Sequence, residues 1–123
     1  MNSEISNRDR CTGSLLGGAV GDALGAPIEF MSASEISNRF GPSGVSGYAP
    51  ISTGRVGWIT DDTQMTLFTA EGLIRAEIKA KRDGGSPDYL SATADSYLRW
   101  LATQRIPAAH PAPKNGWLYK TKA

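Results

Sequence analysis

The sequence predicts an all-α protein, because of the spacing of its apolar residues and the positions of its glycines and prolines. Apolar residues recur every three or four positions in three separate stretches, which is the period of an amphipathic helix. No stretch alternates apolar and polar residues as a half-buried strand would. Glycine and proline interrupt the chain between the three stretches and mark the expected helix ends.

Composition narrows the class of protein further. The 123 residues suit one domain with one modest core, and the net charge of +1 gives no general attraction to nucleic acid or to an anionic membrane. With one cysteine, Cys11, and one histidine, His110, the chain cannot form an internal disulfide or a Cys/His zinc site. No signal peptide or membrane span is recognisable, so we expect a cytoplasmic protein without a membrane partner.

The first helix is expected over about residues 8–24. Glycine occupies every fourth position from 13 to 25, which favours either the close approach of a backbone or ligand, or ordinary close helix packing. Cys11 lies on the apolar side, where a packed thiol is the usual role. Asp22 is an acid among apolar residues, and a structural hydrogen bond to a neighbouring loop is its simplest interpretation.

The next part of the chain is expected to hold one short helix and a long loop. Gly25 and Pro27 end the first helix, and residues 32–35 resemble a capping box for a helix that reaches about residue 39. Residues 40–58 contain five glycines and should form a long glycine-rich loop. Loops of this length in compact domains are usually functional or mobile.

Two further helices are expected, over about 60–82 and 86–103. In the first of them Thr60 or Asp61 would be the cap, and two apolar stripes indicate a central position in the fold. The stripes are Met65, Phe68, Gly72 and Ala76, and Leu67, Ala70, Ile74 and Ile78. The second would begin with Ser86 as cap and Pro87 at the first helical position. Residues 104–123 contain three prolines and are expected to be irregular.

Thr60, Asp61 and Asp62 are the residues most suited to chemistry. Two carboxylates and a hydroxyl at one helix start are ligands that Mg²⁺ or Mn²⁺ prefers, although acids are also common there simply as caps. Glu29 follows the turn at Pro27 and is either a solvated charge or part of a site at the mouth of the loop. Trp58 is either a core residue, the commoner role, or a surface on which a ring stacks.

Two motifs resemble the ADP-ribosylglycohydrolase family. They are GAVGDALGAPIEF at 18–30 and WITDDTQM at 58–65, and the later YLRWL at 97–101 and GWL at 116–118 also resemble bacterial members. The resemblance covers nearly the whole chain as a single domain, 1–123. It implies an orthogonal helical bundle around a cleft with two divalent metals, and hydrolysis of the bond that joins ADP-ribose to a protein side chain.

The resemblance also implies roles for individual residues. Thr60, Asp61 and Asp62 match the first cluster of metal ligands for Mg²⁺ or Mn²⁺. We expect Glu29, Asp61 and Asp62 to act in catalysis, and Asp22, Glu29 and Trp58 to contact an ADP-ribosylated protein or a similar small molecule.

The remaining metal ligands of the family belong to an Asp-x-Asp motif, and no such pair follows Asp62 here. We therefore expect the chain to be an N-terminal portion that supplies half of a two-metal site, with a complementing chain as a possible partner. The alternative is a non-catalytic remnant that binds ADP-ribose or a partner.

Overall fold

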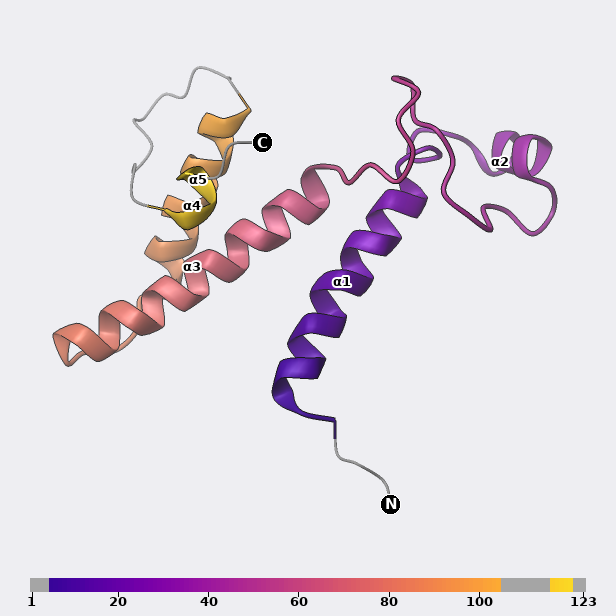
Figure 1. Cartoon of the computed structure of the whole chain (residues 1–123). Helices are drawn as coiled ribbons and strands as arrows, with labels where there is room; N and C mark the ends of the chain where they lie inside the picture. The colour runs from indigo at the N-terminus through magenta and orange to yellow at the C-terminus, as the bar shows by residue number, and fades with distance from the viewer. Residues whose placement is uncertain (1–4, 105–115, 121–123) are drawn as a thin grey trace. The chain divides into compact units, whose positions relative to one another are not determined.

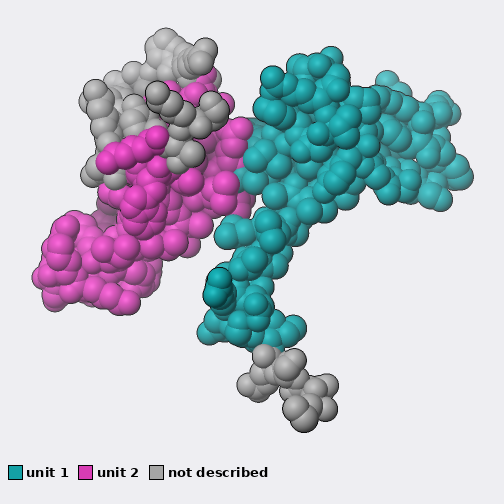
Figure 2. Space-filling view, viewed as in Figure 1, with its two compact units in different colours: residues 1–63 teal, residues 64–123 magenta. Residues whose placement is uncertain are grey.

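A computed structural model describes residues 5–104 and 116–120, and the chain divides into two compact units, residues 1–63 and 64–123 (Figures 1 and 2). Every regular element in the described residues is a helix, so the predicted all-α class is confirmed. One isolated antiparallel bridge joins Pro50 and Val56. None of the described helices combines the length and the apolar character needed to cross a membrane.

The first unit contains α1 (Asn7–Gly25) and α2 (Ala33–Phe40). Ser6 caps α1 by accepting a hydrogen bond from the Asp9 amide at 3.1 Å. The predicted capping box of α2 is present, because the Ser32 hydroxyl accepts from the Glu35 amide and the Ser32 amide donates to the Glu35 carboxylate at 2.7 Å. Both predicted helices are therefore confirmed to within two residues.

The surface of α1 differs from the prediction. Ala23 is its buried residue, whereas Leu16 is 62% exposed, and Cys11 is exposed rather than packed. A Cβ atom added at Gly13, Gly17 or Gly21 would meet nothing within 4 Å. Within the described part of the first unit, no backbone or helix packs against this face, and the approach of a ligand stays a prediction.

Residues 41–60 connect α2 to α3 outside any helix. Gly41, Gly44, Gly54 and Gly57 have φ between +68° and +84°, the left-handed region that glycine adopts without steric cost. The bridge between Pro50 and Val56 is closed by the Ile51 amide, which donates to the Arg55 carbonyl at 2.9 Å. The segment thus folds back on itself before it reaches the start of α3.

Helix α3 (Asp61–Asp83) begins at the end of the first unit and forms the long axis of the second, where α4 (Tyr89–Thr103) packs on it. One predicted stripe is buried, with Phe68 7% and Ala76 3% exposed. The second stripe is not, since Ile74 and Ile78 are about half exposed. A Cβ at Gly72 would lie 2.9 Å from the Thr93 Cα, so this glycine allows the two helices to touch.

Helix α4 starts later than the sequence predicted, and its buried face is polar. Asp88, not Ser86, is the cap, because its carboxylate accepts from the Ser91 amide at 3.0 Å. Ser96 and Arg99 are the residues that α4 buries. Within the segment expected to be irregular, α5 (Trp117–Lys120) forms one helical turn. His110 and the prolines of 105–115 lie outside the described residues.

Candidate functional site

Asp22 connects α1 to the start of α3 through four hydrogen bonds. Its Oδ2 accepts from the backbone amides of Thr60 at 2.8 Å and of Thr63 at 3.2 Å. The Thr60 hydroxyl donates to Oδ1 at 2.7 Å, and the Thr63 hydroxyl donates to Oδ2. The predicted hydrogen bond from Asp22 to a neighbouring segment is therefore present, and all four donors are neutral.

These hydrogen bonds decide the protonation of Asp22. Burial raises the pKa of its carboxyl group, but the hydrogen bonds from Thr63 and Thr60 outweigh burial and hold the pKa below its ordinary value of 3.8. Asp22 is therefore a carboxylate at neutral pH. It brings a negative charge to the first turn of α3, where the amide dipoles of the helix stabilise it.

Thr60 is the N-cap of α3, one of the two residues predicted for that role. Its Oγ1 accepts a hydrogen bond from the Asp62 amide at 3.3 Å and donates its single proton to Asp22. A hydroxyl oxygen has one proton and two lone pairs. Because the proton and one lone pair are used, one lone pair of Thr60 Oγ1 is left for a cation.

Asp61 and Asp62 occupy the first turn of α3, and both are exposed. Among residues 5–104 and 116–120, no group donates a hydrogen bond to either carboxylate or forms an ion pair with it. Together with Asp22, they place three acidic side chains around the first turn of one helix. Carboxylate and hydroxyl oxygens are ligands that Mg²⁺ and Mn²⁺ prefer, so Thr60, Asp61 and Asp62 fit a hard divalent cation.

The described part of the chain forms no complete metal site. It contains no group of three or more Asp, Glu, His or Cys side chains placed to hold an ion. Mg²⁺ requires about six oxygen ligands and usually keeps several waters. Thr60, Asp61 and Asp62 could therefore supply at most part of the ligands that such an ion needs.

Glu29 and Trp58 are both at the surface of the first unit. Glu29 is exposed in the turn that follows α1, and this exposure agrees with its interpretation as a solvated charge. Trp58 is 46% exposed and its ring carries the Arg55 guanidinium 4.2 Å from the ring centroid. The favoured interpretation of Trp58 as a core residue is therefore wrong, and the alternative, a surface on which a ring stacks, stays a prediction.

Two residues of this region were not identified from the sequence. Thr63 contributes two donors to Asp22 and is 8% exposed. Thr63 lies three residues after the N-cap Thr60, and this position could have identified it. The backbone amide there has no partner inside the helix and needs an acceptor. Arg55 lies in the connecting segment, and no sequence pattern points to its contact with Trp58.

Comparison with known proteins agrees with these motifs. The family model described as ADP-ribosylglycohydrolase matches residues 3–122. The chain is also 42% identical over 71 residues to the ADP-ribosyl-[dinitrogen reductase] glycohydrolase of Rhodospirillum rubrum. That match covers 55% of the chain but 23% of the relative, so the chain spans about a quarter of the length of that relative. No solved structure matches the chain.

Proposed function

The chain belongs to the ADP-ribosylglycohydrolase family, and from this premise we propose that it contributes the first metal-ligand cluster of a hydrolase that removes ADP-ribose from protein side chains. In the proposed reaction, water adds to the anomeric carbon of the ribose. The bond from that carbon to the side-chain nitrogen or oxygen breaks, and the released atom takes a proton. The observation that carries the proposal is the pair of free carboxylates, Asp61 and Asp62, beside an oriented Thr60 hydroxyl.

Thr60, Asp61 and Asp62 would have different roles as ligands of Mg²⁺ or Mn²⁺. Asp61 and Asp62 would neutralise the charge of the cation, and the remaining lone pair of Thr60 Oγ1 would occupy a further ligand position. A bound divalent cation would orient the ribose hydroxyls and activate water. Asp22 would act by fixing the direction of the Thr60 hydroxyl, to which it is hydrogen-bonded, and its expected contact with the substrate stays part of the proposal.

Two exposed residues of the same unit support substrate binding. The Trp58 ring is accessible and could stack on a planar base, with the Arg55 guanidinium beside it for a phosphate. Glu29 is exposed after α1, where a carboxylate could hydrogen-bond ribose hydroxyls or act in catalysis. These roles for Trp58 and Glu29 are part of the proposal, and so are a cytoplasmic location and an ADP-ribosylated protein as substrate.

A second candidate function is a binding module without turnover. Among the described residues no group of three or more Asp, Glu, His or Cys side chains is placed to hold an ion, and this favours the alternative. Such a module would bind ADP-ribose, or would pair with a chain that supplies the missing ligands. Turnover by the pure monomeric chain would exclude this alternative.

The test is hydrolysis of ADP-ribosyl-arginine by the 123-residue chain in MgCl₂ or MnCl₂, together with Mn²⁺ binding measured by calorimetry. We expect the triple variant Thr60→Ala/Asp61→Ala/Asp62→Ala to lose both hydrolysis and Mn²⁺ binding, since no other described group replaces these ligands. Asp9→Asn is the matched control, because Asp9 is also an acid in the first turn of a helix. It should retain both.

The outcomes separate the two candidates. Hydrolysis that persists in the triple variant refutes the metal assignment. Mn²⁺ binding without hydrolysis, if it is lost in the triple variant, supports the binding module over the complete enzyme. Equal Mn²⁺ binding by the wild type and the triple variant contradicts both.

A further inference from the structure

Helix α3 carries a strip of exposed apolar residues along the part of it that belongs to the second unit. Leu67 is 36%, Ile74 49% and Ile78 50% exposed, and Leu73, which borders them, is 42% exposed. Residues four and seven positions apart lie on one face of a helix, so Leu67, Ile74 and Ile78 are in line. We call these three residues the outer strip of α3. Contiguous exposed apolar surface of this kind commonly marks an interaction site.

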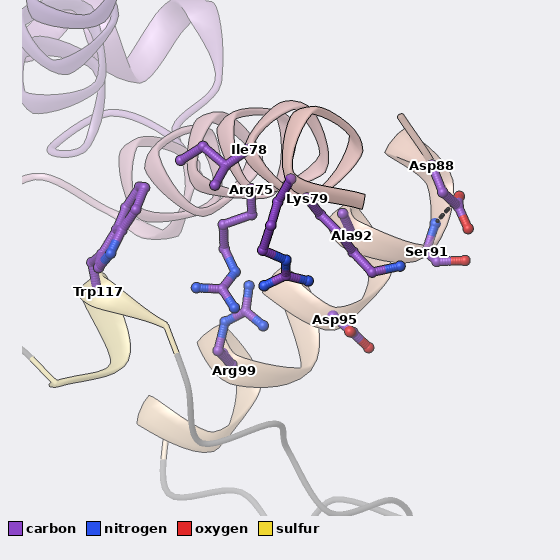
Figure 3. A pocket seen from close by; sticks show the side chains of 10 residues that line it. Arg75, Ile78, Lys79, Asp88, Ser91, Ala92, Asp95, Arg99 and Trp117 are labelled. Carbon is purple, nitrogen blue, oxygen red and sulfur yellow. Dashed lines mark hydrogen bonds between the residues drawn. The ribbon is translucent and has the colours of Figure 1, made fainter. Parts of the chain in front are cut away.

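The other sides of α3 are occupied differently. Helix α4 packs on the side that contains Gly72. Charged residues gather on a further side, where Arg75 and Lys79 line a pocket of about 450 Å³ together with Arg99 of α4 (Figure 3). Of the outer strip only Ile78 lines this pocket, so α4 and the pocket leave the strip open to solvent.

The second unit buries few large apolar residues of its own. Among residues 64–104 and 116–120, the buried apolar side chains are Phe68, Ala76 and Ala80, and two of these three are alanines. A unit of this size seldom has enough core to be stable alone, and oligomerisation is one way to bury more apolar surface. The outer strip is apolar surface of α3 that association could still bury.

The two ends of α3 carry opposite charges. The first turn contains Asp61 and Asp62, and the last turn contains Lys81 and Arg82. Arg82 forms an ion pair with Asp83 at 2.7 Å, so these two residues add no net charge. The last turn therefore contributes one positive charge, that of Lys81, and the first turn contributes two negative charges.

Lys81 is in line with the outer strip. It is exposed and follows Ile74 by seven residues, which is about two helical turns. Among the residues that the structure describes, Lys81 forms no ion pair. A helix with an apolar middle, acids at its start and a cation at its end is complementary to a reversed copy of itself. An unrelated partner helix would not require this distribution of charge.

We propose that the outer strip binds a second copy of this chain, with the two α3 helices antiparallel. A two-fold axis near the middle of the strip places Leu67 of one copy against Ile78 of the other, with Ile74 close to the axis. Lys81 of each copy then lies beside the first turn of the other, near Asp62. Removal of the apolar side chains from water drives the association, and the opposite charges at the ends select the antiparallel orientation over the parallel one.

The proposed dimer goes beyond the proposed hydrolase function and does not require it. Its apolar contact consists of residues that have no role in the proposed metal cluster. Association can therefore be measured in EDTA, without the divalent cation that Asp61 and Asp62 would bind. Failure of either proposal leaves the other testable.

The experiment is sedimentation velocity of the 123-residue chain over a range of concentrations, in EDTA and at low ionic strength. We expect a reversible equilibrium between monomer and dimer. Ile74→Glu places a charge close to the two-fold axis and should weaken the dimer about tenfold or more. Leu90→Glu is the matched control, because Leu90 is an apolar residue of α4 that is 83% exposed and lies outside the strip. It should leave the dissociation constant unchanged.

An exchange of charges tests the antiparallel orientation. Lys81→Glu and Asp62→Lys should each weaken the dimer severalfold, because each brings like charges together at both ends of the interface. The double variant Lys81→Glu/Asp62→Lys restores opposite charges and should recover most of the affinity that the single variants lose. Circular dichroism shows whether each variant is folded.

A dimer that Ile74→Glu weakens, Leu90→Glu preserves and the exchanged charges restore supports the proposal. If Ile74→Glu does not fold, the exchange of charges decides. A monomer at every concentration overturns the proposal and means that the chain's own residues or a different partner cover the strip. Equal weakening by Ile74→Glu and Leu90→Glu overturns it, as do aggregates without a defined size. A double variant that binds no more tightly than Lys81→Glu or Asp62→Lys overturns the antiparallel arrangement.

Discussion

Two carboxylates, Asp22 in the first unit and Glu71 in the second, hold separate segments together by different means. Asp22 accepts hydrogen bonds from two amides and two hydroxyls, all of them neutral. Glu71 is 3% exposed, lies 3.7 Å from the Arg99 guanidinium and accepts the Trp117 amide. The difference is that Asp22 is stabilised by neutral donors and keeps an unpaired negative charge, whereas the charge of Glu71 is paired inside its own unit.

The largest effect should come from breaking the charged pair. Arg99→Met leaves the Glu71 carboxylate buried without its cation, and we expect the free energy of unfolding to fall by about 3–5 kcal/mol. Urea denaturation followed by circular dichroism measures this change. A loss below about 1 kcal/mol would mean that the pair is not desolvated as its burial indicates.

The double variant Glu71→Met/Arg99→Met tests whether the unpaired charge of Glu71 causes the loss of stability in Arg99→Met. Because both charges are removed and the apolar volume is kept, it should recover much of the stability that Arg99→Met loses. Arg8→Met, at an exposed arginine of α1, is the matched control and should leave the midpoint unchanged. A double variant that is no more stable than Arg99→Met would contradict the interpretation of a pure charge effect.

The second effect concerns Asp22. Asp22→Asn removes the charge that four donors surround, and we expect unfolding to become easier by about 2–3 kcal/mol at pH 7. The folded-state pKa of Asp22 lies below 3.8, so its contribution is complete above that value and is lost as the pH falls through the folded-state pKa. The stability difference between wild type and Asp22→Asn should therefore shrink below about pH 4.

Metal binding separates a positioning role for Asp22 from a merely structural one. If Asp22 directs the Thr60 hydroxyl, Asp22→Asn should lower Mn²⁺ affinity by about 10- to 100-fold, as substitutions beside metal ligands do. Calorimetry at a temperature where the variant is folded measures this. Asp9→Asn, at another acid of α1, is the control. An unchanged Mn²⁺ affinity in folded Asp22→Asn would leave Asp22 with stability alone.

The smallest effects should come from two glycines with opposite outcomes. A Cβ at Gly116 would lie 2.5 Å from Arg99 Nε and 3.0 Å from Glu71 Oε1, so Gly116→Ala should cost about 1–3 kcal/mol. A Cβ at Gly21 would meet nothing within 4 Å, so Gly21→Ala should stabilise α1 by about 0.5–1 kcal/mol. Thermal denaturation compares the two, and a shift of the same sign in both would contradict this contrast.

Sequence patterns predicted the helices well because the determinants are local. The capping box at Ser32 and the acidic start of α3 depend on residues within one turn, and both are present. The cap of α4 was predicted at the wrong residue because Ser86 and Asp88, one on each side of Pro87, are both suitable capping residues. The side chain of Asp88, not Ser86, accepts the Ser91 amide.

Burial was predicted less well because it depends on neighbours distant in sequence. Regular apolar spacing does not say which face of α3 another helix covers, and α4 covers the face that contains Gly72 and leaves Ile74 exposed. No local sequence pattern predicts the Glu71–Arg99 pair, because its residues are 28 positions apart on two helices. The acidic cluster at Asp61 and Asp62 was predictable, whereas the partners of Asp22 were not.

The contact between Asp22 and Thr60 also affects the order in which the chain folds. These residues are 38 positions apart, so their hydrogen bonds can form only after a long segment has been closed, at a cost in chain entropy that grows with its length. Helix α3 can elongate from local contacts on its own, but the direction of the Thr60 proton is set by this distant partner. The geometry suited to a cation is therefore a product of long-range closure, and a nascent α3 without α1 has the acids but not the oriented hydroxyl.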